Sequence, residues 1–137
     1  MIRLSTAVVH PWLCDSMGHL TTRHYSAIFD DAVYHLFFEA FSYSPLDPAW
    51  HRLGWADVNQ SFDYKAEVLV GELLEVVGTV TALGRKSVST ELHLLKRGGG
   101  NLAAIARSVT VLFDKELREA VELPDHLRQS ADRLMKG

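Results

Sequence analysis

The chain has 137 residues, of which 47% are hydrophobic and 23% charged, and it contains a single cysteine. A domain of this length buries enough surface to be stable without disulfides or a structural metal, and the composition excludes disordered, collagen-like and disulfide-rich proteins. The formal net charge is −3, from 14 Lys and Arg against 17 Asp and Glu, and the basic residues are scattered. Nucleic acid is therefore not an expected partner.

The expected cellular location follows from features that the sequence lacks. The opening MIRLSTAVVH has no charged region followed by an apolar stretch and a cleavage site, and nowhere do about 18 apolar residues run together. One free cysteine, Cys14, fits a reducing compartment. We therefore expect a cytoplasmic protein with no membrane partner, folded as one domain over residues 1–137.

The first elements are a strand and a long helix. Residues 2–9, closed by Pro11, predict a short strand. From Thr22 onward apolar residues recur every three or four positions, which predicts a helix of about 20 residues ending before Pro45. The positions that follow this spacing are Tyr25, Ile28, Phe29, Ala32, Val33, Leu36, Phe37 and Ala40. Apolar residues on its other faces predict a largely enclosed helix: Ala27, Tyr34 and Phe38.

The second half of the chain alternates with a period of two, which predicts strands. These strands cover residues 61–66, 74–82, 87–94 and 102–113. The joins are short and contain glycine, as hairpin turns do, at residues 70–72, 84–86 and 98–101. The predicted fold class is α+β: an antiparallel meander of about five strands wrapped around the long helix, with a short C-terminal helix over residues 124–136. Because such a sheet leaves edges open, we expect at least a dimer.

Reactive side chains are concentrated just before the long helix. They are His10, Cys14, Asp15, His19 and His24. A helix N-terminus offers unpaired N–H groups and a positive dipole end, so it can stabilise an oxyanion that develops on a carbonyl. Asp15 lies seven residues before Thr22, across a glycine-containing turn. Its carboxylate is therefore a candidate catalytic group beside the same carbonyl.

Other interpretations of these residues are weaker. A thiol nucleophile at Cys14 is disfavoured because the adjacent carboxylate opposes formation of the thiolate. A metal site is disfavoured because the candidate ligands lack a usual spacing: His10, Asp15, His19 and His24. Asp30 and Asp31, within the helix, are expected to be solvated or to contact a second subunit.

The motif Asp-x-x-Gly-His-aliphatic-x-x-x-x-Tyr is formed by Asp15, Gly18, His19, Leu20 and Tyr25. It resembles the signature of hotdog-fold acyl-CoA thioesterases of the 4-hydroxybenzoyl-CoA thioesterase type, and the order of the predicted elements agrees along nearly the whole chain. The resemblance implies an enzyme that hydrolyses an acyl-CoA to a carboxylic acid and coenzyme A without a cofactor. It also implies a homodimer or homotetramer whose sheets join edge to edge.

Three residues are candidate catalytic residues, and the resemblance implies the roles of two of them, Asp15 and Thr22. Asp15 would act as nucleophile or as general base on water, and the N–H near Thr22 would polarise the thioester carbonyl. His19 would fix the turn or tune Asp15. The family usually has Asn after the aliphatic residue of the motif, where this chain has Thr21 and Thr22.

The substrate-binding residues implied by the resemblance are Tyr25, Arg85, Lys86 and Ser87. The last three would lie near the phosphates of coenzyme A, and in a dimer they would face Asp15 of the neighbouring subunit. The acyl group is left open, since Trp12, Tyr25 and Trp55 could line an aryl or an aliphatic pocket, and core positions are more common for Trp12, Trp55, Phe62 and Tyr64.

Two alternative functions remain open. A hydratase or dehydratase acting on an enoyl thioester would need an Asp and a His paired for proton transfer to carbon. A noncatalytic acyl-CoA-binding dimer would use the same fold without the chemistry. Release of free thiol from an acyl-CoA distinguishes the thioesterase from both.

Overall fold

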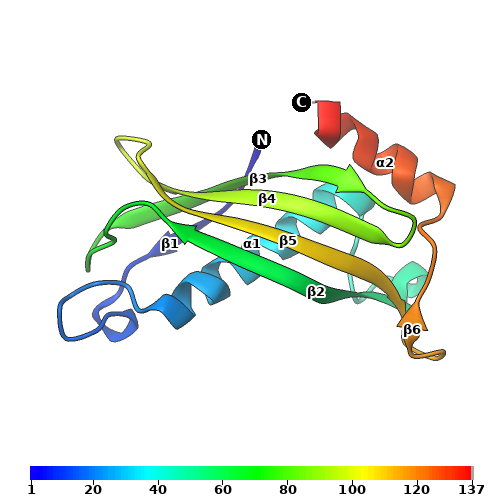
Figure 1. Cartoon of the computed structure of the whole chain (residues 1–137), viewed down its shortest axis with the longest axis horizontal. Helices are drawn as coiled ribbons and strands as arrows, with labels where there is room; N and C mark the ends of the chain where they lie inside the picture. The colour runs from blue at the N-terminus through cyan, green and yellow to red at the C-terminus, as the bar shows by residue number, and fades with distance from the viewer. Residues whose placement is uncertain (137) are drawn as a thin grey trace.

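The computed structural model describes residues 1–136. The helices and strands are β1 (Ile2–Val8), α1 (Thr22–Phe41), β2 (Leu53–Tyr64), β3 (Leu73–Leu83), β4 (Ser87–Lys96), β5 (Leu102–Asp114), β6 (Glu119–Ala120) and α2 (Asp125–Lys136). Single 3-10 turns precede α1 and β2, namely η1 (Pro11–Leu13) and η2 (Pro48–Trp50). The sheet curls around α1, and α2 lies at one end (Figure 1). This arrangement confirms the predicted α+β architecture.

The strand order departs from the predicted meander. It is β1-β3-β4-β5-β2, with β6 beside β5. The turns after β3 and β4 are hairpins as expected, but the hairpin expected at residues 70–72 is wrong, because β2 pairs with β5 and β3 pairs with β1. Residues 71 and 72 instead bond to the end of the first strand segment. The N–H of Gly71 donates to the carbonyl of Val9 at 2.8 Å, and the N–H of Val9 donates to the carbonyl of Glu72 at 3.0 Å. Alternation identifies a strand but does not specify which strand lies beside it. In the observed order β2 lies at an edge of the sheet.

The long helix has the predicted bounds, from Thr22 to Phe41. Its N-cap, Thr21, makes no side-chain cap hydrogen bond. At the other end Ser42 adopts the left-handed conformation, with φ 53°, and its N–H donates to the carbonyls of Phe37 and Phe38. None of the helices within residues 1–136 combines the length and the apolar character needed to cross a membrane.

Only one face of α1 is covered by the sheet. Its buried residues are Tyr25, Phe29, Ala32, Leu36, Phe37, Ala40 and Phe41. On another face, Tyr34 and Phe38 are 59% and 58% exposed. The expected enclosure of the helix is therefore wrong for a single chain, because one curled sheet reaches only one side of it. Two large aromatic side chains remain uncovered.

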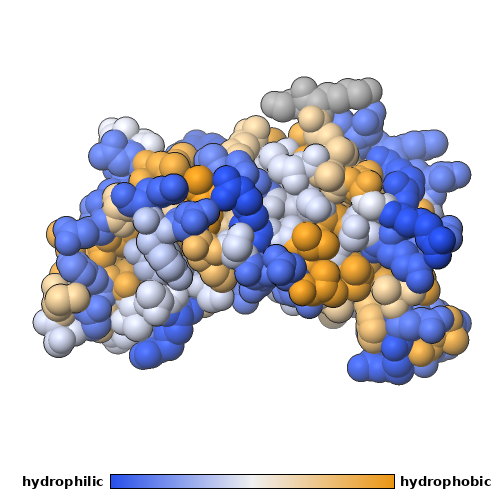
Figure 2. All heavy atoms as spheres, viewed as in Figure 1, coloured by the Kyte–Doolittle hydropathy of each residue, from blue (hydrophilic) through white to orange (hydrophobic). Residues whose placement is uncertain are grey.

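The two faces of the sheet have different chemistry. On the face toward α1, β3 and β4 carry six apolar residues and one polar residue, Thr90, all of them buried. The apolar residues are Leu74, Val76, Val80, Val88, Leu92 and Leu94. The opposite face mixes hydrophilic and apolar side chains (Figure 2). On that face Arg107 contacts Glu91 at 2.8 Å and Asp63 at 3.0 Å. The core therefore lies between the concave side of the sheet and α1, and it is extended by three buried residues of α2: Leu127, Ala131 and Leu134.

Leu36 tests this description of the core, because its side chain is completely buried on the covered face of α1. Leu36→Ala should lower the free energy of unfolding by about 2–5 kcal/mol, the usual cost of an internal Leu-to-Ala cavity. Leu46, which is 90% exposed, supplies the control, and Leu46→Ala should cost less than about 0.5 kcal/mol. Urea unfolding followed by circular dichroism measures both, and similar losses would contradict the assignment.

Candidate functional site

Asp15 lies in a short closed loop between η1 and α1. Cys14 and Leu20 form an antiparallel bridge at the base of this loop. Inside it the N–H of Asp15 donates to the carbonyl of His19 at 2.9 Å, and the N–H of Gly18 donates to the carbonyl of Asp15 at 3.0 Å. Gly18 has φ +78°, a backbone conformation that residues other than glycine rarely adopt. Both the N–H and the carbonyl of Asp15 are therefore hydrogen-bonded within the loop, which fixes its backbone.

The two carboxylate oxygens of Asp15 differ in their surroundings. Oδ1 accepts hydrogen bonds from the N–H groups of Met17 at 2.9 Å and His19 at 3.2 Å. Within residues 1–136, no group donates a hydrogen bond to Oδ2, and the side chain is exposed. One oxygen therefore anchors the carboxylate while the other is free to meet a carbonyl carbon or a water molecule.

The Asp15 loop rests on residues 67–70, which sequence reasoning did not select. The N–H of Leu20 donates to the carbonyl of Val68 at 2.8 Å, and the N–H of Val70 donates to that of Gly18 at 3.1 Å. The imidazole Nε2 of His19 lies 3.3 Å from a carboxylate oxygen of Glu67. His19 therefore binds the turn through its backbone and reaches across to the supporting segment through its side chain.

A hollow of about 300 Å³ joins this loop to the start of α1. Its lining residues are Asp15, His19, Leu20, Thr21, Thr22, Tyr25, Tyr64, Glu67 and Val68. The structure thus brings together four of the residues selected from the sequence: Asp15, His19, Thr22 and Tyr25. In the first turn of α1 the N–H of His24 donates to the carbonyl of Thr21 at 2.9 Å. The backbone N–H groups of the helical residues before His24 have no partner within the helix. A carbonyl oxygen in the hollow would meet the positive end of the helix dipole.

Tyr25 forms the inner wall of the hollow. It is 5% exposed, and its ring meets that of Tyr64 edge-on, with centroids 4.9 Å apart. Burial raises the pKa of the Tyr25 phenol, and the nearby Tyr64 and Glu72 raise it further. Tyr25 is therefore a neutral phenol at physiological pH, able to shape the hollow but not to act as a base.

The expected phosphate-binding residues lie elsewhere. Arg85, Lys86 and Ser87 are in the turn between β3 and β4, at the end of the sheet opposite the Asp15 loop (Figure 1). Arg85 is exposed and its Nε lies 3.2 Å from a carboxylate oxygen of Glu122. Within one chain this turn does not approach Asp15, so the two groups of predicted residues form separate regions.

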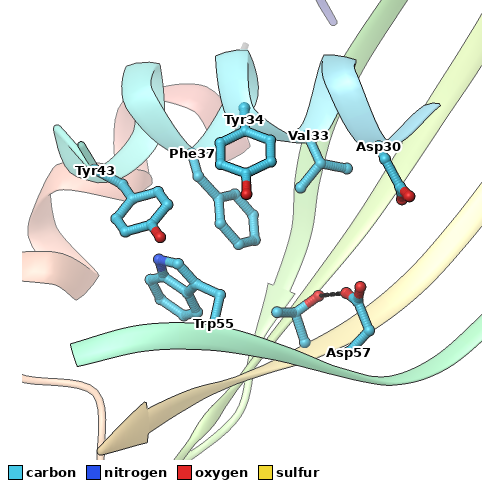
Figure 3. Close-up of a pocket in the computed structure, with 8 residues that line it drawn as sticks. Asp30, Val33, Tyr34, Phe37, Tyr43, Trp55 and Asp57 are labelled. Carbon is cyan, nitrogen blue, oxygen red and sulfur yellow. Dashed lines mark hydrogen bonds between the residues drawn. The ribbon is translucent and has the colours of Figure 1, made fainter. Parts of the chain in front are cut away.

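A second cavity, missed by the sequence analysis, lies between α1 and β2 (Figure 3). It has a volume of about 210 Å³ and is lined by Asp30, Val33, Tyr34, Phe37, Tyr43, Trp55, Asp57 and Thr110. The Trp55 ring packs against Phe37 with centroids 4.8 Å apart. The indole Nε1 of Trp55 is buried and has no hydrogen-bond partner within residues 1–136. One wall of this aromatic pocket is therefore made of aromatic rings, and the N–H of Trp55 within it is buried and, among the described residues, unpaired.

The other wall of the aromatic pocket is acidic. Asp57 Oδ1 accepts a hydrogen bond from the Thr110 hydroxyl at 2.9 Å. Burial raises the pKa of the Asp30 carboxyl, and the negative charges of Asp57 and Asp31 raise it further, against a lowering by a hydrogen bond from Gln60. The aromatic pocket thus offers carboxyl oxygens at one end and aromatic faces at the other.

Periodicity could have pointed to part of this pocket. Four of its lining residues recur at helical spacing and share one side of α1: Asp30, Val33, Tyr34 and Phe37. Only the pairing of β2 with β5 places Trp55 and Asp57 opposite them.

The core role expected for Trp12 is wrong, since Trp12 is 73% exposed. Its ring stacks on that of His10, at a centroid distance of 4.4 Å.

The fold is shared with several solved structures. A hypothetical protein of Staphylococcus aureus, solved in complex with CoA, is 19% identical and superposes with a TM-score of 0.84 over 99% of this chain and 87% of its own. A Pseudomonas aeruginosa protein is 28% identical, with a TM-score of 0.82 over 98% of this chain and 91% of its own. A 1,4-dihydroxy-2-naphthoyl-CoA thioesterase from Synechocystis is 16% identical, with a TM-score of 0.81 over 96% of each chain.

Sequence comparison identifies the family. No curated protein matches the sequence. Residues 9–130 match the model of the thioesterase-like superfamily, a span that includes the Asp15 loop, α1 and β2 to β5. The matched span covers most of the chain and agrees with the hotdog architecture of the solved structures. The chain therefore belongs to the thioesterase-like superfamily, with the hotdog fold.

Proposed function

We propose that this protein hydrolyses an acyl-CoA thioester in the hollow beside Asp15. The observation that carries the proposal is that one hollow contains both a carboxylate with an open oxygen and the first turn of α1. Thioester hydrolysis needs both, because a nucleophile must reach the carbonyl carbon while donors stabilise the charge that develops on the carbonyl oxygen.

The proposed reaction has two possible first steps. If Asp15 is the nucleophile, Oδ2 attacks the carbonyl carbon, the C–S bond breaks, coenzyme A leaves as its thiolate, and water then hydrolyses the mixed anhydride. If Asp15 is the general base, it takes a proton from water as the water attacks the same carbon. The tetrahedral intermediate then collapses with cleavage of the C–S bond, and the proton passes from Asp15 to the departing thiolate of coenzyme A. In both routes the carbonyl oxygen accepts hydrogen bonds from N–H groups near Thr22 in the tetrahedral intermediate, and the products are a carboxylic acid and coenzyme A.

We assign His19 a positioning role in this reaction. Its N–H holds Oδ1 of Asp15 at 3.2 Å, so it fixes the direction of the open oxygen. Its imidazole lies 3.3 Å from Glu67, which ties the loop to the supporting segment. The hydratase alternative needs an imidazole aimed at a substrate carbon, and this contact with Glu67 gives His19 a different partner.

Two subunits are needed to bring the predicted residues together. Arg85, Lys86 and Ser87 lie at the far end of the sheet from Asp15 (Figure 1). Edge-to-edge pairing of two β2 strands about a two-fold axis would reverse one subunit relative to the other, and the turn of one would then approach Asp15 of its partner. We propose a homodimer of this kind, or a tetramer built from it, that binds coenzyme A across its interface.

The edge and the uncovered helix face support this assembly. β2 pairs on one side only, with β5, and residues 57–61 at its centre are all exposed. An unpaired strand edge is a template for another strand. Tyr34 and Phe38 of α1, both more than half exposed, lie on a helix face that the sheet leaves open and would be covered by a partner.

We further propose that the aromatic pocket between α1 and β2 binds the acyl group. Its volume of about 210 Å³ exceeds the roughly 150 Å³ of an engineered cavity that binds benzene, so it admits one substituted aromatic ring. The Asp30 and Asp57 carboxyls can accept a hydrogen bond from a hydroxyl on that ring. A hydroxylated aryl thioester fits this lining.

The aromatic pocket is shut off from Asp15 of the same chain. Two ring pairs stand between them, Tyr25 with Tyr64 at 4.9 Å and Phe29 with Phe62 at 5.9 Å. The axial distance from Thr22 to Asp30 is also about 12 Å, at 1.5 Å per helical residue. Antiparallel pairing of two β2 strands would instead bring the Trp55 end of one strand beside the Tyr64 end of the other. Each aromatic pocket would then serve the partner's Asp15.

Asp15→Asn tests the catalytic assignment. The replacement is nearly isosteric, so the loop should keep its fold, but the amide is neither a base nor an effective nucleophile. We expect kcat to fall by at least about 10²-fold, measured as free thiol released from an aryl-CoA. Asp47 supplies a matched control, because its Oδ1 also accepts from the N–H two residues on, at 2.9 Å. Asp47→Asn should keep full activity, and activity of Asp15→Asn within threefold of wild type would reject Asp15.

Gly18→Ala tests whether backbone geometry sets the position of the carboxylate. A Cβ at Gly18 meets nothing within 4 Å, so the change acts through its φ of +78°, at a cost of about 1–2 kcal/mol. We expect kcat to fall by about 10- to 100-fold as Asp15 shifts. Gly98→Ala imposes the same kind of strain, at φ +88° and with nothing within 4 Å, at a residue that does not line the hollow. Equal activity of the two variants would contradict the role of Gly18.

The shared site is tested by mixing two inactive variants in one dimer. Asp15→Asn removes the carboxylate, and Val33→Phe fills the aromatic pocket and should lower aryl-CoA hydrolysis by roughly 10-fold or more. If sites are shared, a heterodimer of the two keeps one complete site and about half of the wild-type activity. If each chain uses its own pocket, the heterodimer is inactive.

Differently tagged, co-expressed chains supply these heterodimers. The control is a heterodimer of a wild-type chain with a chain that carries both Asp15→Asn and Val33→Phe. This heterodimer is inactive when the sites are shared between subunits, and it keeps half of the wild-type activity when each chain uses its own pocket. Sedimentation at assay concentration accompanies the kinetics. A stable, fully active monomer would overturn the shared site and the dimer together.

A further inference from the structure

The turn between β3 and β4 is held in place by groups from three other parts of the chain. The guanidinium Nη2 of Arg128 donates to the carbonyls of Gly84 at 2.7 Å and Arg85 at 3.0 Å. The Arg85 carbonyl also accepts from the N–H of Leu123 at 2.9 Å, and the Lys86 carbonyl accepts from that of Leu112 at 3.0 Å. Every carbonyl of residues 84–86 is therefore occupied by a donor outside the turn.

The hydrogen bonds to these three carbonyls make the turn more attractive to an anion. Carbonyl oxygens repel an anion, and here all three are engaged with α2, the segment before it and β5. Arg128 also adds a third cation to those of Arg85 and Lys86. It is half-buried, and hydrogen bonds from a charged donor are stronger than those between neutral groups. The turn is thus a fixed backbone carrying mobile cationic side chains.

One acidic side chain competes for this positive charge. Glu122 lies just before α2, and its carboxylate is 3.2 Å from Nε of Arg85. Both side chains are mostly exposed, at 71% for Arg85 and 65% for Glu122, so their pairing is weak and reversible. A phosphate carries more charge than a carboxylate and offers oxygens that match the guanidinium. It can therefore displace Glu122 from Arg85.

We propose that the C-terminal segment is part of the coenzyme A site: Arg128 is a positioning residue that holds the phosphate-binding turn, and Glu122 is an internal anion that occupies Arg85 until a substrate phosphate replaces it. This inference rests on the proposed role of the turn in binding coenzyme A. It gives α2 a function in substrate affinity, and it predicts opposite effects for two substitutions in one short segment.

Binding of coenzyme A, measured by isothermal titration calorimetry on the full-length protein, tests both roles. Glu122→Gln removes the competing charge and should tighten the Kd for coenzyme A by about two- to fivefold, the size of an exposed ion pair. Arg128→Lys keeps the charge but cannot hold two carbonyls with a planar fork, and it should weaken binding by about fivefold or more. Neither change should alter binding of pantetheine, which lacks the nucleotide phosphates.

Matched controls come from the same end of the chain. Glu119→Gln removes an equal charge from β6, where no ion pair of Glu119 occurs within residues 1–136. Arg133→Lys changes an arginine of α2 that donates to the carbonyl of Glu39 and not to the turn. Both should leave the Kd for coenzyme A within about 1.5-fold of wild type, since surface charges away from the contact contribute little. Circular dichroism checks that each variant is folded.

Each outcome decides between the roles. An unchanged or weaker Kd in Glu122→Gln overturns the internal anion. An unchanged Kd in Arg128→Lys, or a loss that pantetheine shares equally, overturns the positioning role. Wild-type protein that binds coenzyme A no more tightly than pantetheine overturns both. Hydrolysis of an N-acetylcysteamine thioester is measured separately, because it reports the chemistry at Asp15 without any phosphate. Failure of the proposed function and failure of this inference are therefore seen in different experiments.

Discussion

A single layer of sheet has to cover a single long helix, and the other features of the molecule depend on that constraint. α1 has 20 residues, or about 30 Å, and β4 has 10 residues, or about 33 Å. Because the two lengths match, the first turn of α1 lies at the end of the sheet, where Tyr25 packs against Tyr64, the last residue of β2. Polar N–H groups stay accessible there, while the middle of the helix is buried against apolar side chains. The hollow beside Asp15 is a consequence of where the covering layer stops.

The same constraint explains why the loop around Asp15 is built from backbone hydrogen bonds. The end of the layer has to be closed by the segment between β1 and α1, and it is closed by pairing with residues 67–70. Such pairing depends little on side-chain identity, so only a few positions of the loop carry specific requirements. Gly18 is needed for its left-handed conformation, and Asp15 is needed for its carboxylate. These are two of the residues that made the motif recognisable.

The sequence predicted what local patterns can encode. Helical spacing gave the bounds of α1, and alternation identified the strands. The proximity of Asp15, His19, Thr22 and Tyr25 followed because they are neighbours in the chain. The position of β2 was predicted wrongly because alternation does not specify which strand lies alongside. The aromatic pocket was missed for the same reason, since Trp55 and Asp57 meet Asp30 only through the pairing of β2 with β5. The contacts of Arg128 join residues more than 40 positions apart and have no local signature.

The strand order also has a consequence for how the chain folds. β3, β4 and β5 are joined by short turns, so their pairing closes small loops at low entropic cost. β1 finds its place only by pairing with β3 across some 70 residues, as in the pair Ile2 and Gly78, and β2 must meet β5 across about 50, as in Trp55 and Leu112. Contacts this distant in sequence slow folding, because their loop-closure entropy is lost before the contacts stabilise the fold. The segment that carries Asp15 lies between β1 and α1 and pairs with residues 67–70, so it too depends on contacts about 50 residues apart in sequence. The position of the Asp15 carboxylate therefore depends on the long-range topology of the chain and not only on the local motif.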